Sequence, residues 1–173
     1  MLDDDIVKAA ERLMAICKRK NLLVATAESC TAGLVAGTLS EIPGVSSILD
    51  RGYITYSNQA KHEMLGVPRE VLDRSGAVSR ETAEAMVRGV LGRARVDLAV
   101  SVTGIAGPDG GSAEKPVGLV HFAAATRTGK LTHAEMRYGN IGRANVRKQS
   151  VMKAFLMLHE LAEGEGANPP PAA

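Results

Sequence analysis

Two short apolar runs, Leu22–Thr26 and Leu98–Thr103, constrain the fold of this chain more than any other feature of its sequence. Each run has the length and the apolar character of a strand that is buried in a parallel sheet. Such strands are covered by helices on both faces of the sheet. The runs therefore indicate a layered α/β domain, provided that helical patterns flank them along the chain.

Helical spacing is found on either side of both runs. The first helix follows the acidic run Asp3–Asp5, which suits a helix N-terminus, and Ser57 and Ser79 can cap later helices. The helices that we expect are about Asp4–Arg19, Thr31–Ser40, a helix through Lys61–Leu65, an amphipathic helix opened by Ser79, and about Ile141–Glu163.

Three further segments have the pattern of strands. Arg51–Tyr56 alternates between apolar and polar residues, and Gly118–Ala125 and Leu131–Tyr138 flank a Thr128-Gly129 turn, which indicates a hairpin. The whole pattern predicts a single α/β domain with three layers, α/β/α, around a mixed sheet. We expect this domain to cover residues 1–165, and we expect the Pro-rich tail, residues 166–173, to be disordered.

Composition limits the class of protein. The chain has 173 residues, of which 45% are hydrophobic, and this length suits one domain that needs neither disulfides nor a structural metal. The formal net charge is +2, aromatic residues make up 3% of the chain, and there is no Trp. These values argue against a dedicated nucleic-acid-binding protein, which normally has a basic stripe or aromatic platforms for stacking bases.

Cysteine usage and the N-terminal sequence bear on the compartment. Cys17 and Cys30 form no CxxC pair and the four histidines are scattered, so we expect no metal site and a reducing compartment. The first residues lack the pattern of a signal peptide, and no apolar run is long enough to span a bilayer. We therefore expect a cytoplasmic protein that has no membrane partner.

Three polar loops are expected at one edge of the sheet. They are Ala27–Thr31, Tyr56–Lys61 and Thr103–Pro116, and each follows a predicted strand. In open α/β sheets the ligand binds beyond the carboxyl ends of the strands, where such loops leave the sheet. This edge is therefore the predicted ligand site.

The third loop is the most glycine-dense stretch of the chain. Gly104, Gly107, Gly110 and Gly111 could present backbone N–H groups to an anion or a polar ligand, although a long turn also explains them. The loop has neither the Walker A pattern nor the dinucleotide-binding fingerprint. ATP and NAD motifs are therefore absent.

Ser29 lies in the predicted turn between a strand and a helix, where a hydroxyl can act as a nucleophile and free N–H groups can hold an oxyanion. A helix cap formed by Ser29 or Thr31 is the alternative interpretation. No histidine has a context that marks it as a base, which leaves Lys61 or Tyr56. Lys61 could accept a proton near neutrality only if its pKa fell from about 10.4 to roughly 7.4–8.4. Cys30 is a rival nucleophile or a small packing residue.

The chain resembles the family of C-terminal domains of the competence and damage-inducible protein CinA, whose stand-alone members are nicotinamide-nucleotide amidases of the PncC type. The resemblance covers about Leu13–Leu161, and Ala32 departs from it, because the family often has a second glycine after ESCT. The N-terminal molybdopterin-binding-like domain of the tandem protein is missing, so its activity should be missing too. The matching motifs are TAESCT at Thr26–Thr31, RGYITYSNQAK at Arg51–Lys61, GAVS at Gly76–Ser79, and SVTGIAGPDGGSAEKPVG at Ser101–Gly118.

The resemblance implies hydrolysis of nicotinamide mononucleotide to nicotinate mononucleotide and ammonia, without a metal or a cofactor. It also implies a fold similar to that of anticodon-binding domains, and a homodimer. It makes Ser29 the nucleophile and Lys61 the general base, with Tyr56 assisting proton transfer to ammonia. A non-catalytic nucleotide-binding or interaction module is the alternative function.

The resemblance further implies that Thr103 and Arg143 position the substrate. A guanidinium matches phosphate geometry, although Arg143 could also be an ordinary solvated arginine near the start of the last helix. The remaining residues that we expect to contact the substrate are Gly104, Gly107, Gly110, Gly111, Cys30 and Thr31.

Overall fold

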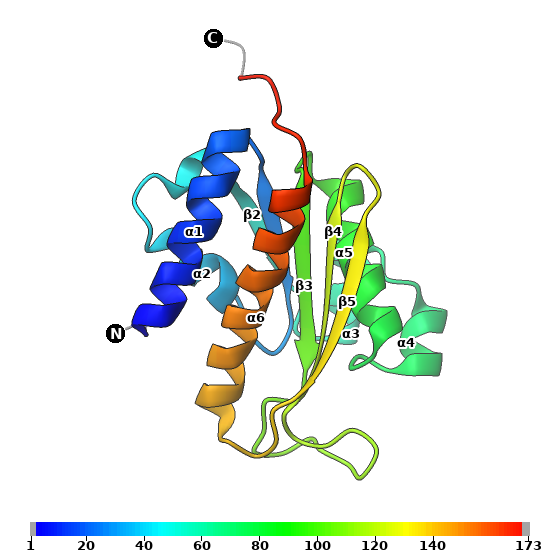
Figure 1. Cartoon of the computed structure of the whole chain (residues 1–173). Coiled ribbons are helices and arrows are strands. Elements are labelled where there is room, and N and C mark those ends of the chain that lie inside the picture. The colour runs from blue at the N-terminus through cyan, green and yellow to red at the C-terminus, as the bar shows by residue number, and fades with distance from the viewer. Residues whose placement is uncertain (1–2, 171–173) are drawn as a thin grey trace.

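A five-stranded mixed sheet forms the centre of the computed structural model, which describes residues 3–170 (Figure 1). The strands lie in the order β2-β1-β3-β4-β5. β1 is parallel to β2 and β3, β4 is antiparallel to β3, and β5 is antiparallel to β4. The predicted α/β class, mixed sheet and hairpin are confirmed. The strands are β1 Val24–Glu28, β2 Leu49–Ile54, β3 Leu98–Gly104, β4 Leu119–Thr126 and β5 Leu131–Arg137.

The burial of each strand follows from its place in the sheet. Every residue of β1 and β4 is buried, and so is every residue of β3 except Gly104. The edge strands β2 and β5 have exposed residues along their length. The two apolar runs of the sequence therefore became the two adjacent parallel strands β1 and β3, covered on both faces.

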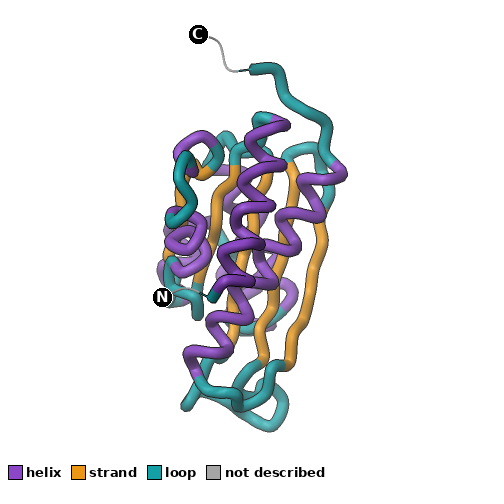
Figure 2. Tube along the Cα trace, turned by 60° about the vertical axis from the view of Figure 1, so that its left-hand side comes forward, coloured by secondary structure: helices purple, strands orange, loops and turns teal. Residues whose placement is uncertain are grey.

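Helices cover both faces of the sheet, which confirms the three layers (Figures 1 and 2). One core cluster joins α1, α2 and α6 to one face, with Leu13, Val102 and Phe122 among its members. A second cluster joins α5 to the other face, and α3 and α4 pack beside α5. The helices are α1 Asp4–Lys20, α2 Leu34–Ser40, α3 Asn58–Leu65, α4 Arg69–Ser75, α5 Arg80–Arg93 and α6 Arg143–Gly164.

The helix caps agree with the sequence more closely than the helix starts do. The side chains of Ser57 and Ser79 accept hydrogen bonds from the backbone of α3 and α5, as expected of N-caps. α2 begins at Leu34 rather than Thr31, because Ala32 and Gly33 have positive φ angles of 50° and 91° that no helix can continue through.

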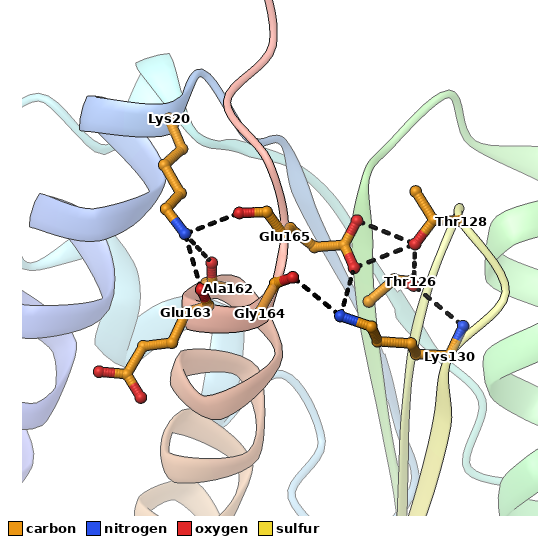
Figure 3. A network of polar contacts seen from close by, with 8 residues as sticks. All are labelled: Lys20, Thr126, Thr128, Lys130, Ala162, Glu163, Gly164 and Glu165. Carbon is orange, nitrogen blue, oxygen red and sulfur yellow. Dashed lines mark hydrogen bonds and ion pairs between the residues drawn. The ribbon is translucent and has the colours of Figure 1, made fainter.

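Polar contacts hold the end of α6 against α1 and the β4–β5 turn (Figure 3). Lys20 Nζ donates to the carbonyl oxygens of Ala162, Glu163 and Glu165 at 2.8, 2.8 and 2.7 Å. The carboxylate of Glu165 accepts from Thr128 and pairs with Lys130. We call these residues the α6 staple.

The chain continues beyond the α6 staple without a helix or a strand. The backbone N–H of Asn168 donates to the carbonyl oxygen of Lys20 at 2.8 Å, and its side chain donates to Asp97. The boundary at residue 165 and the disorder of the tail stay predictions, and residues 171–173 lie outside the described residues. None of the helices within residues 3–170 has both the length and the apolar character that a bilayer span requires.

Candidate active site

The three predicted loops meet at the carboxyl edge of the parallel strands, around a cavity of about 240 Å³. The edge lies at the lower end of the molecule in Figure 1, where the long loop after β3 and the start of α6 come together. The lining residues are Ser29, Cys30, Tyr56, Ala77, Val78, Thr103, Gly104, Ile105, Ala106, Gly107, Asp109, Gly110 and Arg143.

Ser29 and Lys61 are hydrogen-bonded directly beside this cavity. Ser29, at the end of β1, is 8% exposed, and Lys61, on α3, is 0% exposed. Lys61 Nζ lies 3.0 Å from Ser29 Oγ, 2.9 Å from the carbonyl oxygen of Thr55 and 3.4 Å from that of Tyr56. Larger cavities of about 520 and 490 Å³ lie elsewhere, but neither is lined by a hydroxyl that is bonded to a lysine.

The surroundings of Lys61 favour the neutral amine. Burial lowers its pKa from 10.5 to about 8, and the neighbouring Cys30 opposes this shift only in part. No carboxylate lies within ion-pair distance of Lys61 in the described part of the chain. The sequence interpretation required a lowered pKa for a lysine base, and here desolvation without a counter-ion is its physical cause.

Glu28 holds the turn that carries Ser29. Its buried carboxylate accepts hydrogen bonds from the Thr26 hydroxyl and from the backbone N–H groups of Val35 and Ala36, each at 3.0 Å. Gly33, the N-cap of α2, has no side chain, so Glu28 caps this helix from the end of β1. Sequence reasoning missed this role, although an acidic residue before a strand-to-helix turn was a usable signal.

Arg143 joins two of the loops. Its guanidinium donates to the Tyr56 hydroxyl and to the carbonyl oxygen of Gly107, both at 3.0 Å. Tyr56 is 57% exposed, and its contact with Lys61 is through the backbone carbonyl rather than the hydroxyl. Arg143 is therefore part of the cavity wall, although the residue is exposed to solvent.

Close backbone contacts and positive φ angles explain the glycines of the loop after β3. A Cβ on Gly104 would lie 2.7 Å from the carbonyl oxygen of Leu119, and Gly107 and Gly110 have φ angles of 80° and 88°. These three glycines line the cavity, whereas Gly111 packs against Val117 away from it.

Of the other predicted residues, some line the cavity and one does not. Thr103 lines the cavity, and its hydroxyl donates to the carbonyl oxygen of Ala77 at 2.7 Å. Cys30 also lines it, but burial raises the pKa of its thiol to about 11, which disfavours a thiolate nucleophile. Thr31 is fully buried outside the lining, where its carbonyl oxygen accepts from Arg147. Among residues 3–170, no cluster of three or more His, Cys, Asp or Glu side chains is arranged to hold a metal.

A family model, the CinA C-terminal domain, matches residues 6–162. This chain belongs to that family. Family members with solved structures include the competence/damage inducible protein CihA of Agrobacterium tumefaciens, with a TM-score of 0.92, 53% identity and coverage of 93% of this chain and 98% of that one. A CinA superfamily protein of Escherichia coli has a TM-score of 0.86 at 31% identity, covering 93% of each chain.

Some of the named relatives are about as long as this chain, and others are much longer. The nicotinamide-nucleotide amidohydrolases PncC of Enterobacter agglomerans and Escherichia coli K12 are 49% and 45% identical over 80% and 91% of this chain, which covers 84% and 95% of their lengths. A putative competence-damage inducible protein of Caldanaerobacter subterraneus is 43% identical over 94% of this chain. The chain spans only 39% of the length of that relative.

Proposed function

We propose that this chain hydrolyses the carboxamide of nicotinamide mononucleotide to nicotinate mononucleotide and ammonia, with Ser29 as the nucleophile and Lys61 as the general base. The PncC relatives, which match over nearly their whole length, support the reaction. The observation that carries the mechanism is the hydrogen bond between Ser29 and the buried Lys61.

The contacts of Lys61 suit a base. A neutral amine has two N–H donors and one lone pair, and the carbonyl oxygens of Thr55 and Tyr56 can accept the two donors. The lone pair is then left for the proton of the Ser29 hydroxyl. A protonated amine would instead place a third N–H against Ser29 Oγ, which prevents proton transfer in the required direction.

The proposed reaction is acyl transfer in two stages. Ser29 Oγ forms a bond to the carboxamide carbon while its proton moves to Lys61, and the carbonyl electron pair moves to the oxygen. The carbon–nitrogen bond then breaks, and ammonia leaves with a proton that Lys61 supplies. Help from Tyr56, whose hydroxyl is bonded to Arg143, stays a prediction. Water attacks the resulting ester, Lys61 takes its proton, and the carboxylic acid leaves as Ser29 Oγ is reprotonated.

Backbone N–H groups after Ser29 are suited to the oxyanion. Those of Cys30 and Thr31 donate to no other residue in the described chain. Because Cys30 lines the cavity and Thr31 does not, we assign the oxyanion to the N–H of Cys30. Such fixed donors stabilise the charge that develops on the carbonyl oxygen. We assign Arg143 to the phosphate, because two of its five N–H donors suffice for its protein contacts. Thr103 helps to position the substrate, and the homodimer and the cytoplasmic location stay predictions.

Ammonia release from nicotinamide mononucleotide tests this function. Ser29→Ala should lower kcat by at least roughly a thousandfold, because it removes the nucleophile. Ser112→Ala, a control at an exposed serine of the glycine loop, should keep the activity. Activity that survives Ser29→Ala but is lost in Cys30→Ala would assign the reaction to the thiol. A wild-type protein that binds the nucleotide but releases no ammonia would favour the non-catalytic module.

A further inference from the structure

The wall of the candidate site carries two opposite charges that do not pair. Asp109 and Arg143 both line the cavity of about 240 Å³. The guanidinium of Arg143 is bonded to Gly107 and Tyr56, and within residues 3–170 neither residue is part of an ion pair. The carboxylate of Asp109 accepts no hydrogen bond from the described chain, so it is available to a ligand.

The conformation of the glycine loop after β3 holds the backbone on both sides of Asp109. Gly107 and Gly110, on either side of Asp109, have positive φ angles that side chains rarely adopt. The carbonyl oxygen of Gly107 is held by Arg143, and the loop closes beyond Gly110 where the N–H of Ser112 donates to the carbonyl oxygen of Lys115 at 2.8 Å. The backbone is therefore held on both sides of the exposed residue Asp109, while Arg143 is engaged elsewhere.

A cavity with separated charges of opposite sign complements a ligand that also carries both signs. Oxidised nicotinamide mononucleotide is such a ligand, with a positive pyridinium ring and a negative phosphate. A ligand that fills this cavity contacts the residues that carry both charges, and charges within the screening length of about 8 Å are only partly screened by salt. The ring must also lie close to Lys61 when its carboxamide reaches Ser29, and a protonated Lys61 would repel it.

We propose that Asp109 is a specificity-determining residue that selects the cationic pyridinium ring of the oxidised nucleotide, an inference that rests on the proposed function. The carboxylate offsets the repulsion between the ring and the cations of the site. It also disfavours a second carboxylate there, so it weakens binding of the nicotinate product and speeds its release. Contact of Asp109 with the ribose hydroxyls is the competing role, which would not depend on the ring charge.

Two ligands that differ in ring charge separate these roles. Oxidised nicotinamide mononucleotide and its reduced dihydro form share the ribose and the phosphate, but only the oxidised ring is positive. Their dissociation constants can be measured by calorimetry on Ser29→Ala protein, with and without Asp109→Asn. We expect Asp109→Asn to raise the dissociation constant of the oxidised ligand about fivefold, which is the effect of one close charge pair at high dielectric. The dissociation constant of the reduced ligand should rise less than about twofold.

Two control variants accompany the measurement. Asp109→Glu keeps the charge and should keep the preference for the oxidised ligand. Glu114→Gln removes an exposed carboxylate of the same loop outside the cavity and should change neither constant.

Each other result overturns the inference. An equal loss for both ligands would place Asp109 on the ribose, and no loss for either, or no binding of either, would remove Asp109 from recognition. Ammonia release by the protein with Ser29 intact is measured separately. Charge selection without ammonia release would contradict only the proposed function, and ammonia release without charge selection only the role of Asp109.

Discussion

Lys61 shows how burial can suit a residue to the proposed role of base at the expense of stability. Its pKa in the folded protein is lowered by burial to about 8, whereas an unfolded lysine titrates near 10.4. Between these two values the unfolded state binds more protons, so the free energy of unfolding rises with pH through this window. Below about pH 8 both states are protonated, and the full cost of burying the cation is present.

The same shift predicts the pH dependence of the proposed reaction. Because Lys61 must be neutral to accept the proton of Ser29, kcat/KM should rise about tenfold per pH unit below its pKa and level off above about pH 8. Rates of ammonia release across this range give the profile. Lys61→Arg, which stays protonated, should be inactive throughout. A profile that is flat through pH 8 would contradict Lys61 as the base.

Sequence reasoning identified Ser29 and Lys61 as candidates but left a helix cap and a tyrosine base open. The sequence does not show their proximity: the two side chains are 32 positions apart, and the amine is buried where α3 packs against α5 and β2. No pattern in the sequence marks a lysine as buried. Asp109 was missed for a similar reason, because a carboxylate in a glycine loop is usually a solvated turn residue.

At the scale of the elements, the link between β1 and α2 depends on Glu28. Glu28→Gln would place an amide NH₂ group against hydroxyl and N–H donors whose hydrogen bonds the carboxylate now accepts. The loss should lower the free energy of unfolding by about 1–3 kcal/mol. We expect a lower melting temperature and a lower kcat with little change in KM, since the turn also carries Ser29. Thermal unfolding and ammonia release measure the two effects.

A matched substitution tests whether the effect belongs to this position. Glu63→Gln changes an exposed glutamate on α3 and should alter neither quantity by much. Wild-type stability and activity in Glu28→Gln would show that Glu28 does not hold the turn.

The elements that the sequence predicted well are those with strong local signals. The apolar runs became β1 and β3, and the serine caps opened α3 and α5. The seven-residue helix α4 was missed, because it follows Pro68 without a side-chain cap and has only one buried residue, Leu72. A helix this short depends on its packing against α5 rather than on its own pattern.

At the scale of the molecule, α6 connects the candidate site to the opposite end of the fold. Lys20→Met would remove three N–H donors from carbonyl oxygens at the end of α6, which should destabilise the protein by about 1–3 kcal/mol. The melting temperature should fall by roughly 2–4 °C per kcal/mol for a chain of this size. Activity below the transition should be unchanged, because the α6 staple and the cavity lie at opposite ends of α6 (Figure 1).

Lys18→Met, at an exposed position in the same helical turn of α1, is the control for Lys20→Met. Its melting temperature should remain close to that of the wild type. A loss of activity in Lys20→Met at a temperature where the protein is folded would show that the two ends of α6 are coupled.

The length of α6 has a practical consequence. With 22 residues it spans about 33 Å, and Arg143 begins it while the α6 staple ends it. A linker attached after the staple would therefore leave the molecule on the side away from the cavity. Protein tethered to a bead or an electrode at that point would present its open loops to the passing solution, ready for a flow assay of ammonia.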